Sequence, residues 1–130
     1  MYRWIEHTSE LELEIEVQTE EEAFAEALTA LAELVGDYGA GPPERRRLVV
    51  RADDPPALLA AWLDELVFLA ETEGLIPERV DELELRGNGL RAVVTARPGE
   101  PRHIVKAVTY HRLELTEDEG GWRARAVLDV

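Results

Sequence analysis

The chain has 130 residues and no cysteine, and its formal net charge is −14, from 28 acidic and 14 basic residues. The length fits a single domain over residues 1–130, and a content of 45% hydrophobic and 32% charged residues is typical of a folded globular protein. Without cysteine, disulfides, thiolate metal sites and cysteine nucleophiles are excluded.

The charge also limits the partners of the chain. Nucleic-acid affinity comes largely from Lys and Arg that neutralise phosphates, so we expect no direct binding to nucleic acid. A basic protein partner or bound cations suit an acidic surface better. No apolar stretch has the length of a signal region or a membrane span, and we therefore expect a cytoplasmic protein that does not bind a membrane.

The first predicted elements are a strand and a helix. Residues 11–17 read Leu-Glu-Leu-Glu-Ile-Glu-Val, and this alternation predicts a strand with one covered face and one wet face. Thr19 and Glu22 have the spacing of a capping box at the start of a helix. Gly36 is placed to end that helix.

The later elements follow from the same rules of periodicity and capping. In chain order they are a loop at 36–43, a strand at 47–52, a helix from Asp54 to about Gly74, and strands at 80–86, 90–96, 103–115 and 122–130. Two helices cannot cover both faces of a sheet of about six strands. We therefore expect an α+β fold, a two-layer sandwich with both helices packed on one face of a mostly antiparallel sheet.

Strand alternation places two carboxylates on one face of this sheet. If the apolar residues of 11–17 face the helices, Glu10 points away from them. In the last strand, the more apolar set of alternate residues should likewise face the helices. Asp129 belongs to the other set and therefore lies on the outer side, next to Val130 with its terminal carboxylate. Oxygen ligands suit a hard cation such as Ca²⁺ or Mg²⁺. Two acids on one face are nevertheless ordinary in a chain with 28 of them.

Three histidines and one lysine are the other candidates for chemistry. His7 precedes the first strand, and His103 lies at a loop-to-strand junction where we expect it to be solvated. His111 shares parity with apolar neighbours, which favours a hydrogen-bonded core or edge histidine. Lys106 is either a solvated strand residue or a cation near the acidic site or a partner. The sequence contains no nucleophile elbow and no Gly-rich phosphate loop, so hydrolase chemistry is disfavoured.

Several segments resemble the motifs of the archease family, in the order in which that family carries them. They are Tyr2–Glu10, Thr19–Phe24, Leu58–Phe68, Val105–His111, Gly121–Trp122 and Val127–Val130. The opening segment differs from the family's pattern, because Glu6 and Glu10 stand where the family usually has Asp. A glutamate keeps the charge but moves the carboxylate by one methylene, which can change metal affinity or preference.

The resemblance implies an activator of an RtcB-type RNA ligase and not an enzyme, so no catalytic residue is expected in this chain. Such a ligase uses GTP and Mn²⁺ to join an RNA end with a cyclic phosphate or 3′-phosphate to a 5′-hydroxyl end. The family promotes guanylylation and multiple turnover of the ligase in tRNA splicing or RNA repair.

The resemblance also implies specific site residues. A divalent metal, Ca²⁺ or Mg²⁺ with Mn²⁺ as a further candidate, would be bound by Glu10, Asp129 and Val130. These positions coincide with the pair that strand parity places on one face. Glu6, His7 and Lys106 are candidates for contact with the ligase.

Two alternatives remain open at this point. A general acidic chaperone or interaction module without ligase specificity would also fit the charge of −14 and the lack of nucleophiles. A metal-dependent phosphohydrolase would rest on the carboxylates alone.

Overall fold

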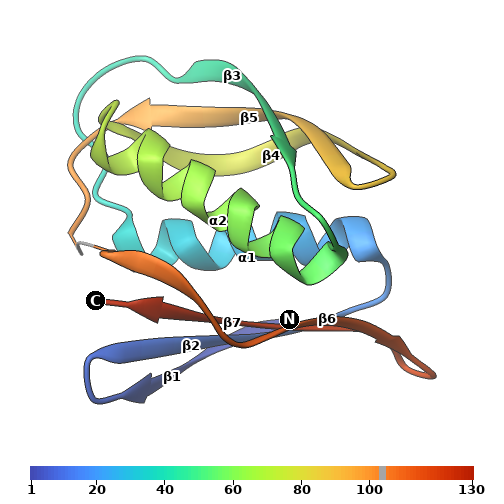
Figure 1. Ribbon diagram of the computed structural model, residues 1–130. Helices are drawn as coiled ribbons and strands as arrows, with labels where there is room; N and C mark the ends of the chain where they lie inside the picture. Colours follow the sequence, from blue (N-terminus) through green and yellow to red (C-terminus); the bar gives the residue numbers. More distant parts are fainter. Residues whose placement is uncertain (103–104) are drawn as a thin grey trace.

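Two helices lie between two antiparallel sheets in the computed structural model, which describes residues 1–102 and 105–130 (Figure 1). A four-stranded sheet has the order β1-β2-β7-β6, and a three-stranded sheet has the order β3-β5-β4. The elements are β1 Tyr2–His7, β2 Glu10–Val17, α1 Glu20–Val35, β3 Glu44–Arg51, α2 Pro55–Glu71, β4 Leu75–Arg86, β5 Gly89–Pro98, β6 Ala107–Asp118 and β7 Gly121–Asp129.

The α+β class, the antiparallel pairing and the packing of helices on sheet are confirmed, but the strands are arranged differently from the expected single sheet. Seven strands form two sheets in the described residues, and each helix contacts both sheets. The reason lies in the helices. Ala23 and Ala30 of α1 are fully buried although they lie beside the stripe formed by Phe24, Leu28 and Leu31. A helix that is buried on more than one side needs a layer on each side.

The helix boundaries follow from their caps as predicted. The Thr19 hydroxyl accepts a hydrogen bond from the Glu22 N–H at 3.2 Å, and the Asp54 carboxylate accepts one from the Ala57 N–H at 2.8 Å. These bonds satisfy N–H groups that have no partner within the first turn. The second helix ends at Glu71, slightly before the predicted end. Within residues 1–102 and 105–130, no helix is long and apolar enough to cross a membrane.

The N-terminal residues form a strand that the sequence analysis did not assign. β1 pairs antiparallel with β2, so that Tyr2 lies opposite Ile15 and His7 opposite Glu10. Ser9 in the connecting turn has a φ of 64°, a left-handed conformation that tight turns use. The turn brings the opening segment and the first predicted strand together as one hairpin at the edge of the four-stranded sheet (Figure 1).

Strand β6 contains a bulge that breaks its alternation. Thr109 is opposite Val127 and Glu114 is opposite Arg125, so that residues 110–113 lie opposite a single residue of β7. His111 falls in this bulge and is exposed, so the core alternative for this histidine is wrong and its position is on an edge strand. The prediction for His103 lies outside the described residues.

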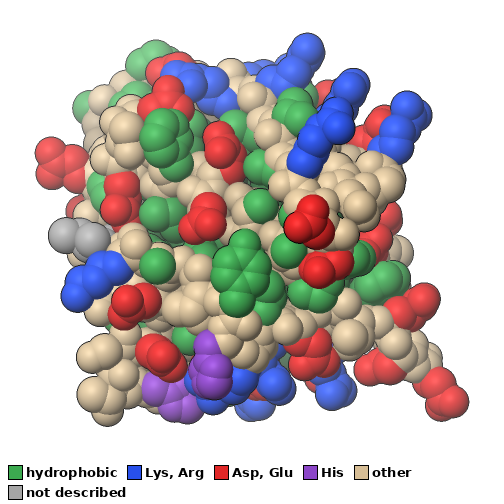
Figure 2. Space-filling model, viewed as in Figure 1, with side chains coloured by type: hydrophobic (Ala, Val, Ile, Leu, Met, Phe, Trp, Pro, Cys, Tyr) green, Lys and Arg blue, Asp and Glu red, His purple; other side chains and the backbone are tan. Residues whose placement is uncertain are grey.

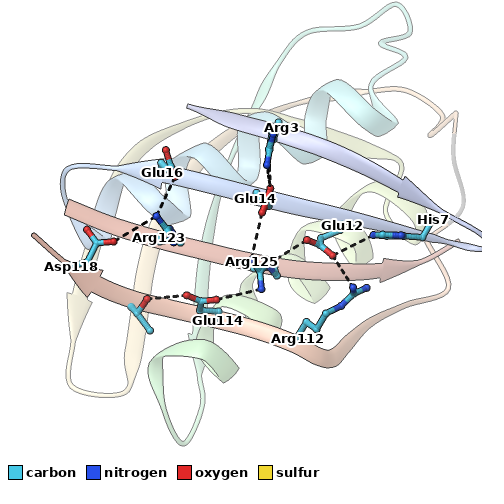
Figure 3. A network of polar contacts seen from close by, with 11 residues as sticks. Arg3, His7, Glu12, Glu14, Glu16, Arg112, Glu114, Asp118, Arg123 and Arg125 are labelled. Carbon is cyan, nitrogen blue, oxygen red and sulfur yellow. Dashed lines mark hydrogen bonds and ion pairs between the residues drawn. The ribbon is translucent and has the colours of Figure 1, made fainter. Parts of the chain in front are cut away.

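Ion pairs cross the outer face of the four-stranded sheet and meet at Glu12 (Figure 3). Only 6% of Glu12 is exposed. Its carboxylate lies 3.4 Å from His7 Nε2, 3.3 Å from Arg112 Nη1 and 3.4 Å from Arg125 Nε. These three side chains come from β1, β6 and β7, the other strands of the sheet. Arg125 also reaches Glu14, at 3.6 Å, so the charges tie all four strands together.

Trp62 of α2 is the largest side chain that is fully buried, and its indole N–H donates to the Phe24 carbonyl of α1 at 2.9 Å. We expect Trp62→Phe to lower the free energy of unfolding by roughly 1–3 kcal/mol, because it removes this donor and part of the ring volume. Chemical denaturation would measure the loss. Phe68→Leu on the same helix is the control, since Phe68 is 50% exposed and should change stability by less than about 0.5 kcal/mol.

Glu12 provides a second test of stability. We expect Glu12→Gln to destabilise the fold by about 1–2 kcal/mol, because it leaves the partly exposed guanidinium groups of Arg112 and Arg125 beside a neutral amide. Glu16→Gln is the matched control on the same strand, since the Glu16 side chain is 71% exposed and contacts Arg123 alone, at 3.5 Å, in the described residues. If urea denaturation gives the two variants the same free energy of unfolding, the contacts of Glu12 do not stabilise the fold.

A pH-dependent contribution comes from Arg3 and Glu14. The Arg3 Nε donates to Glu14 Oε1 at 2.8 Å, and this hydrogen bond is the main cause that lowers the pKa of Glu14. A carboxyl with a lowered pKa stabilises the fold above its unfolded pKa and loses this effect as pH falls through its folded pKa. Arg3→Gln should therefore destabilise near neutral pH and lose its effect once Glu14 is protonated. Chemical denaturation near neutral pH, and again at a pH low enough to protonate Glu14, measures this effect. A loss of stability that is the same at both pH values would contradict the prediction.

Candidate metal and partner site

The register of β2 and β7 brings two of the predicted metal ligands together. Glu10 lies directly opposite Asp129, and such cross-strand neighbours have Cβ atoms about 4.5–5.5 Å apart on the same face. Glu10 begins β2 and Asp129 ends β7, so the pair lies at the end of the sheet where the β1–β2 turn is found. The two carboxylates are neighbours, as strand parity predicts, and metal binding by them stays a prediction.

The main chain around this pair is held on both sides of β7. The Val130 N–H donates to the Ser9 carbonyl at 3.2 Å, and the Lys106 N–H donates to the Asp129 carbonyl at 2.8 Å. The backbone of Lys106 is thereby fixed beside the acidic pair, while its side chain is exposed. The predicted ligand Val130 and the predicted contact residue Lys106 therefore lie at the same end of the sheet as Glu10.

An open groove of about 890 Å³ runs along this end of the molecule. It contains the two predicted contact residues Glu6 and His7 together with Glu10 and Val130, whereas Asp129 does not line it. The other lining residues were not predicted, and they are Trp4, Leu11, Glu33, Leu34 and Arg102. Glu33 and Arg102 come from the end of α1 and from the loop after β5, so no local sequence signal places them near Glu10.

The groove has a polar wall with a defined set of contacts. The Tyr2 hydroxyl donates to the Glu33 carboxylate, and burial together with this hydrogen bond raises the pKa of Tyr2 to about 12. The Arg102 guanidinium donates to the Glu33 carbonyl at 2.9 Å. The indole N–H of Trp4 is buried and has no hydrogen-bond partner in the described part of the chain. The Trp4 ring lines the groove, whereas its buried N–H is not exposed to a ligand there.

Arg112 places a cation beside the acidic pair. Its Nη2 donates to Glu10 Oε2 at 3.4 Å. Its Nη1 lies 3.3 Å from Glu12, a contact that Figure 3 shows. Strand alternation could not identify Arg112 as a neighbour of Glu10, because the position of Arg112 depends on the bulge in β6. Glu10 and Arg112 have side chains that are 36% and 37% exposed, so solvent reaches the contact.

The donor atoms of this site fit a hard divalent cation. Ca²⁺ and Mg²⁺ prefer oxygen ligands, and Glu10 and Asp129 supply carboxylates from adjacent backbone positions. No three acidic or histidine side chains converge as a metal cluster in residues 1–102 and 105–130. His7 is directed instead to Glu12. A bound cation would therefore have two side-chain ligands and would complete its shell with main-chain oxygens or water.

Acidic and basic side chains are distributed unevenly over the surface that Figure 2 shows. Figure 2 shows acidic side chains scattered over the face in front of α2, whereas most of the basic side chains gather over the three-stranded sheet and beneath the four-stranded one. The histidines in that view lie beside the lower basic group. Some of the basic residues on the two sheets pair with acids, as Arg45 does with Asp81 and Arg123 with Glu16.

Comparisons with known proteins match nearly the whole chain. Residues 2–130 match the Archease protein family (MTH1598/TM1083). Protein archease of Methanopyrus kandleri is 33% identical over 97% of this chain and 96% of its own length. Protein archease of Pyrobaculum islandicum is 34% identical over 99% and 95%, respectively.

Two solved structures have the same fold. The solution structure of protein 1598 of Methanobacterium thermoautotrophicum is 30% identical, with a TM-score of 0.74, and the match covers 99% of this chain and 98% of that one. The crystal structure of a Thermotoga maritima protein described as an archease and possible chaperone gives a TM-score of 0.71 at 23% identity, over 100% and 98%. By the match of the family over residues 2–130, this chain belongs to the archease family.

Proposed function

We propose that the chain activates an RtcB-type RNA ligase, promoting its guanylylation and multiple-turnover ligation in tRNA splicing or RNA repair. Membership of the archease family supports this role. The observation that carries the proposal is the juxtaposition of Glu10 with Asp129 beside the groove that contains Glu6 and His7. On this view the chain acts through a protein partner in the cytoplasm and has no catalytic residues of its own.

A divalent metal belongs to this proposal. Glu10, Asp129 and the main-chain oxygens of Val130 would bind Ca²⁺, Mg²⁺ or Mn²⁺, and the cation would supply a positive charge for phosphate oxygens of the nucleotide. The two carboxylates would hold that charge, and the pairing of β2 with β7 places them on one face of the sheet. Lys106, whose backbone N–H donates a hydrogen bond to the Asp129 carbonyl, would contact the same partner.

Charge supports docking to a basic surface of the ligase. The net charge is −14, and complementary charge raises the rate of encounter and suppresses wrong partners. Such docking weakens as salt screens the charges. An association with the ligase that is insensitive to salt would contradict this part of the proposal.

The alternative function is a general acidic chaperone without ligase specificity. The description of the Thermotoga maritima protein as a possible chaperone favours it, as does the acidic surface. A chaperone would suppress aggregation of unrelated unfolded proteins at similar concentrations. The ligase activator would show no such effect while still accelerating ligation.

We expect the protein to increase turnover in an RNA ligation assay with the cognate ligase, GTP and Mn²⁺. Asp129→Asn should reduce this increase at least about tenfold, since it removes one of two carboxylate ligands of the proposed cation. Asp118→Asn is the matched control, because Asp118 lies at the far end of β6 and its side chain is 49% exposed. Full activity of Asp129→Asn, with an unchanged melting temperature, would refute the role of the metal. No acceleration of a competent ligase by the natural protein would refute the activator role itself.

A further inference from the structure

Arg112 has an unusual backbone conformation for a non-glycine residue. Its φ is 58°, in the left-handed region that costs an L-residue of this kind free energy. The residue lies in the bulge of β6, where residues 110–113 oppose one residue of β7. Strained conformations persist where the surroundings compensate for them, and they concentrate at functional positions. The consequence of this backbone conformation is seen in the contacts of the Arg112 side chain.

The bulge directs the guanidinium of Arg112 across the sheet to two carboxylates of β2. Nη2 donates to Glu10 at 3.4 Å, and Nη1 lies 3.3 Å from Glu12. Strand β7 lies between β6 and β2 in the sheet, so the side chain spans a whole strand to reach them. One of these carboxylates, Glu10, is the one that faces Asp129.

We propose that Arg112 is a built-in competitor of the divalent cation at Glu10, so that a metal binds there only by displacing the guanidinium and Arg112 thereby weakens the affinity of the site. This inference rests on the metal site of the proposed function. A cation near a carboxylate lowers its attraction for a second cation, because the two positive charges repel each other and share one set of oxygen acceptors.

The contacts show why the exchange needs little rearrangement. The Arg112–Glu10 contact is long for a charged hydrogen bond and is open to solvent, with side chains 37% and 36% exposed. The second contact is to Glu12, which is only 6% exposed. When Glu10 is released, the contact with Glu12 keeps Arg112 on the face of the sheet. His7 and Arg125 contact the same Glu12 carboxylate. The displacement then involves one side chain and leaves the backbone bulge in place.

Calorimetric titration of the purified protein with Ca²⁺ and separately with Mg²⁺ tests the proposal. Arg112→Gln removes the charge and should tighten metal binding roughly two- to fivefold, the range expected from losing an exposed ion-pair cation. Arg112→Gly serves as the second variant, because glycine adopts the left-handed backbone without strain, and it should tighten binding equally. Arg112→Lys keeps the charge and should bind close to the natural protein.

Arg123→Gln is the matched control on the same face. Arg123 contacts Glu16 at 3.5 Å and Asp118 at 3.9 Å, remote from Glu10 along β2 and β7, so its loss should leave metal affinity unchanged. Melting temperatures without metal identify any variant that is not folded.

The outcomes separate this inference from the function on which it rests. Tighter binding by Arg112→Gln and Arg112→Gly, with Arg123→Gln unchanged, supports competition. Unchanged or weaker binding by the folded Arg112 variants overturns it, while Glu10-dependent binding by the natural protein would leave the metal site standing. Absence of binding by the natural protein, or binding that survives Glu10→Gln, overturns the metal site and the competition together.

Discussion

The pairing of β2 with β7 is the constraint on which the site depends, because it joins residues from the two ends of the chain. Contacts so distant in sequence cost loop-closure entropy. Burial of Leu13 and Ile15 together with Ala124 and Ala126 beneath the helices offsets this cost. A slip of one residue would move Leu13 and Ile15 to the wet face. The register that protects the core is therefore the register that sets Glu10 opposite Asp129.

The alternation of apolar and polar residues predicts well which side of β2 is covered. It predicts poorly how the helices and the two sheets are layered. The Leu-Glu repeat of residues 11–17 indicates which side chains are covered, and Leu13 and Ile15 are indeed buried. The pattern does not tell which element covers a strand or how many strands share one sheet. The fully buried Ala23 and Ala30 of α1 carry that information, since small apolar residues beside a wide stripe favour a second layer. Strand β1 was not predicted because apolar and polar residues alternate only weakly over residues 2–7.

The parts of the site that sequence could not predict depend on irregular backbone and on distant segments. A parity argument holds only while a strand is regular, so the bulge at 110–113 invalidates it for Arg112. Glu33 and Arg102 reach the groove through the packing of α1 and the loop after β5. By contrast, Glu10 and Asp129 lie in regular pairing, which is why their common face followed from the sequence alone.

The ion pairs along β2 limit which carboxylates on the outer face are free to bind a cation or a basic partner. Glu12, Glu14 and Glu16 each contact at least one arginine, so the middle of the outer face is neutralised internally. At the end with the β1–β2 turn, Glu10 contacts Arg112, whereas Asp129 on the same face has no ion pair within residues 1–102 and 105–130. A total charge of −14 attracts any basic protein. Specificity requires charge that is not neutralised at one defined place, and on this face the turn end of β2 and β7 provides it.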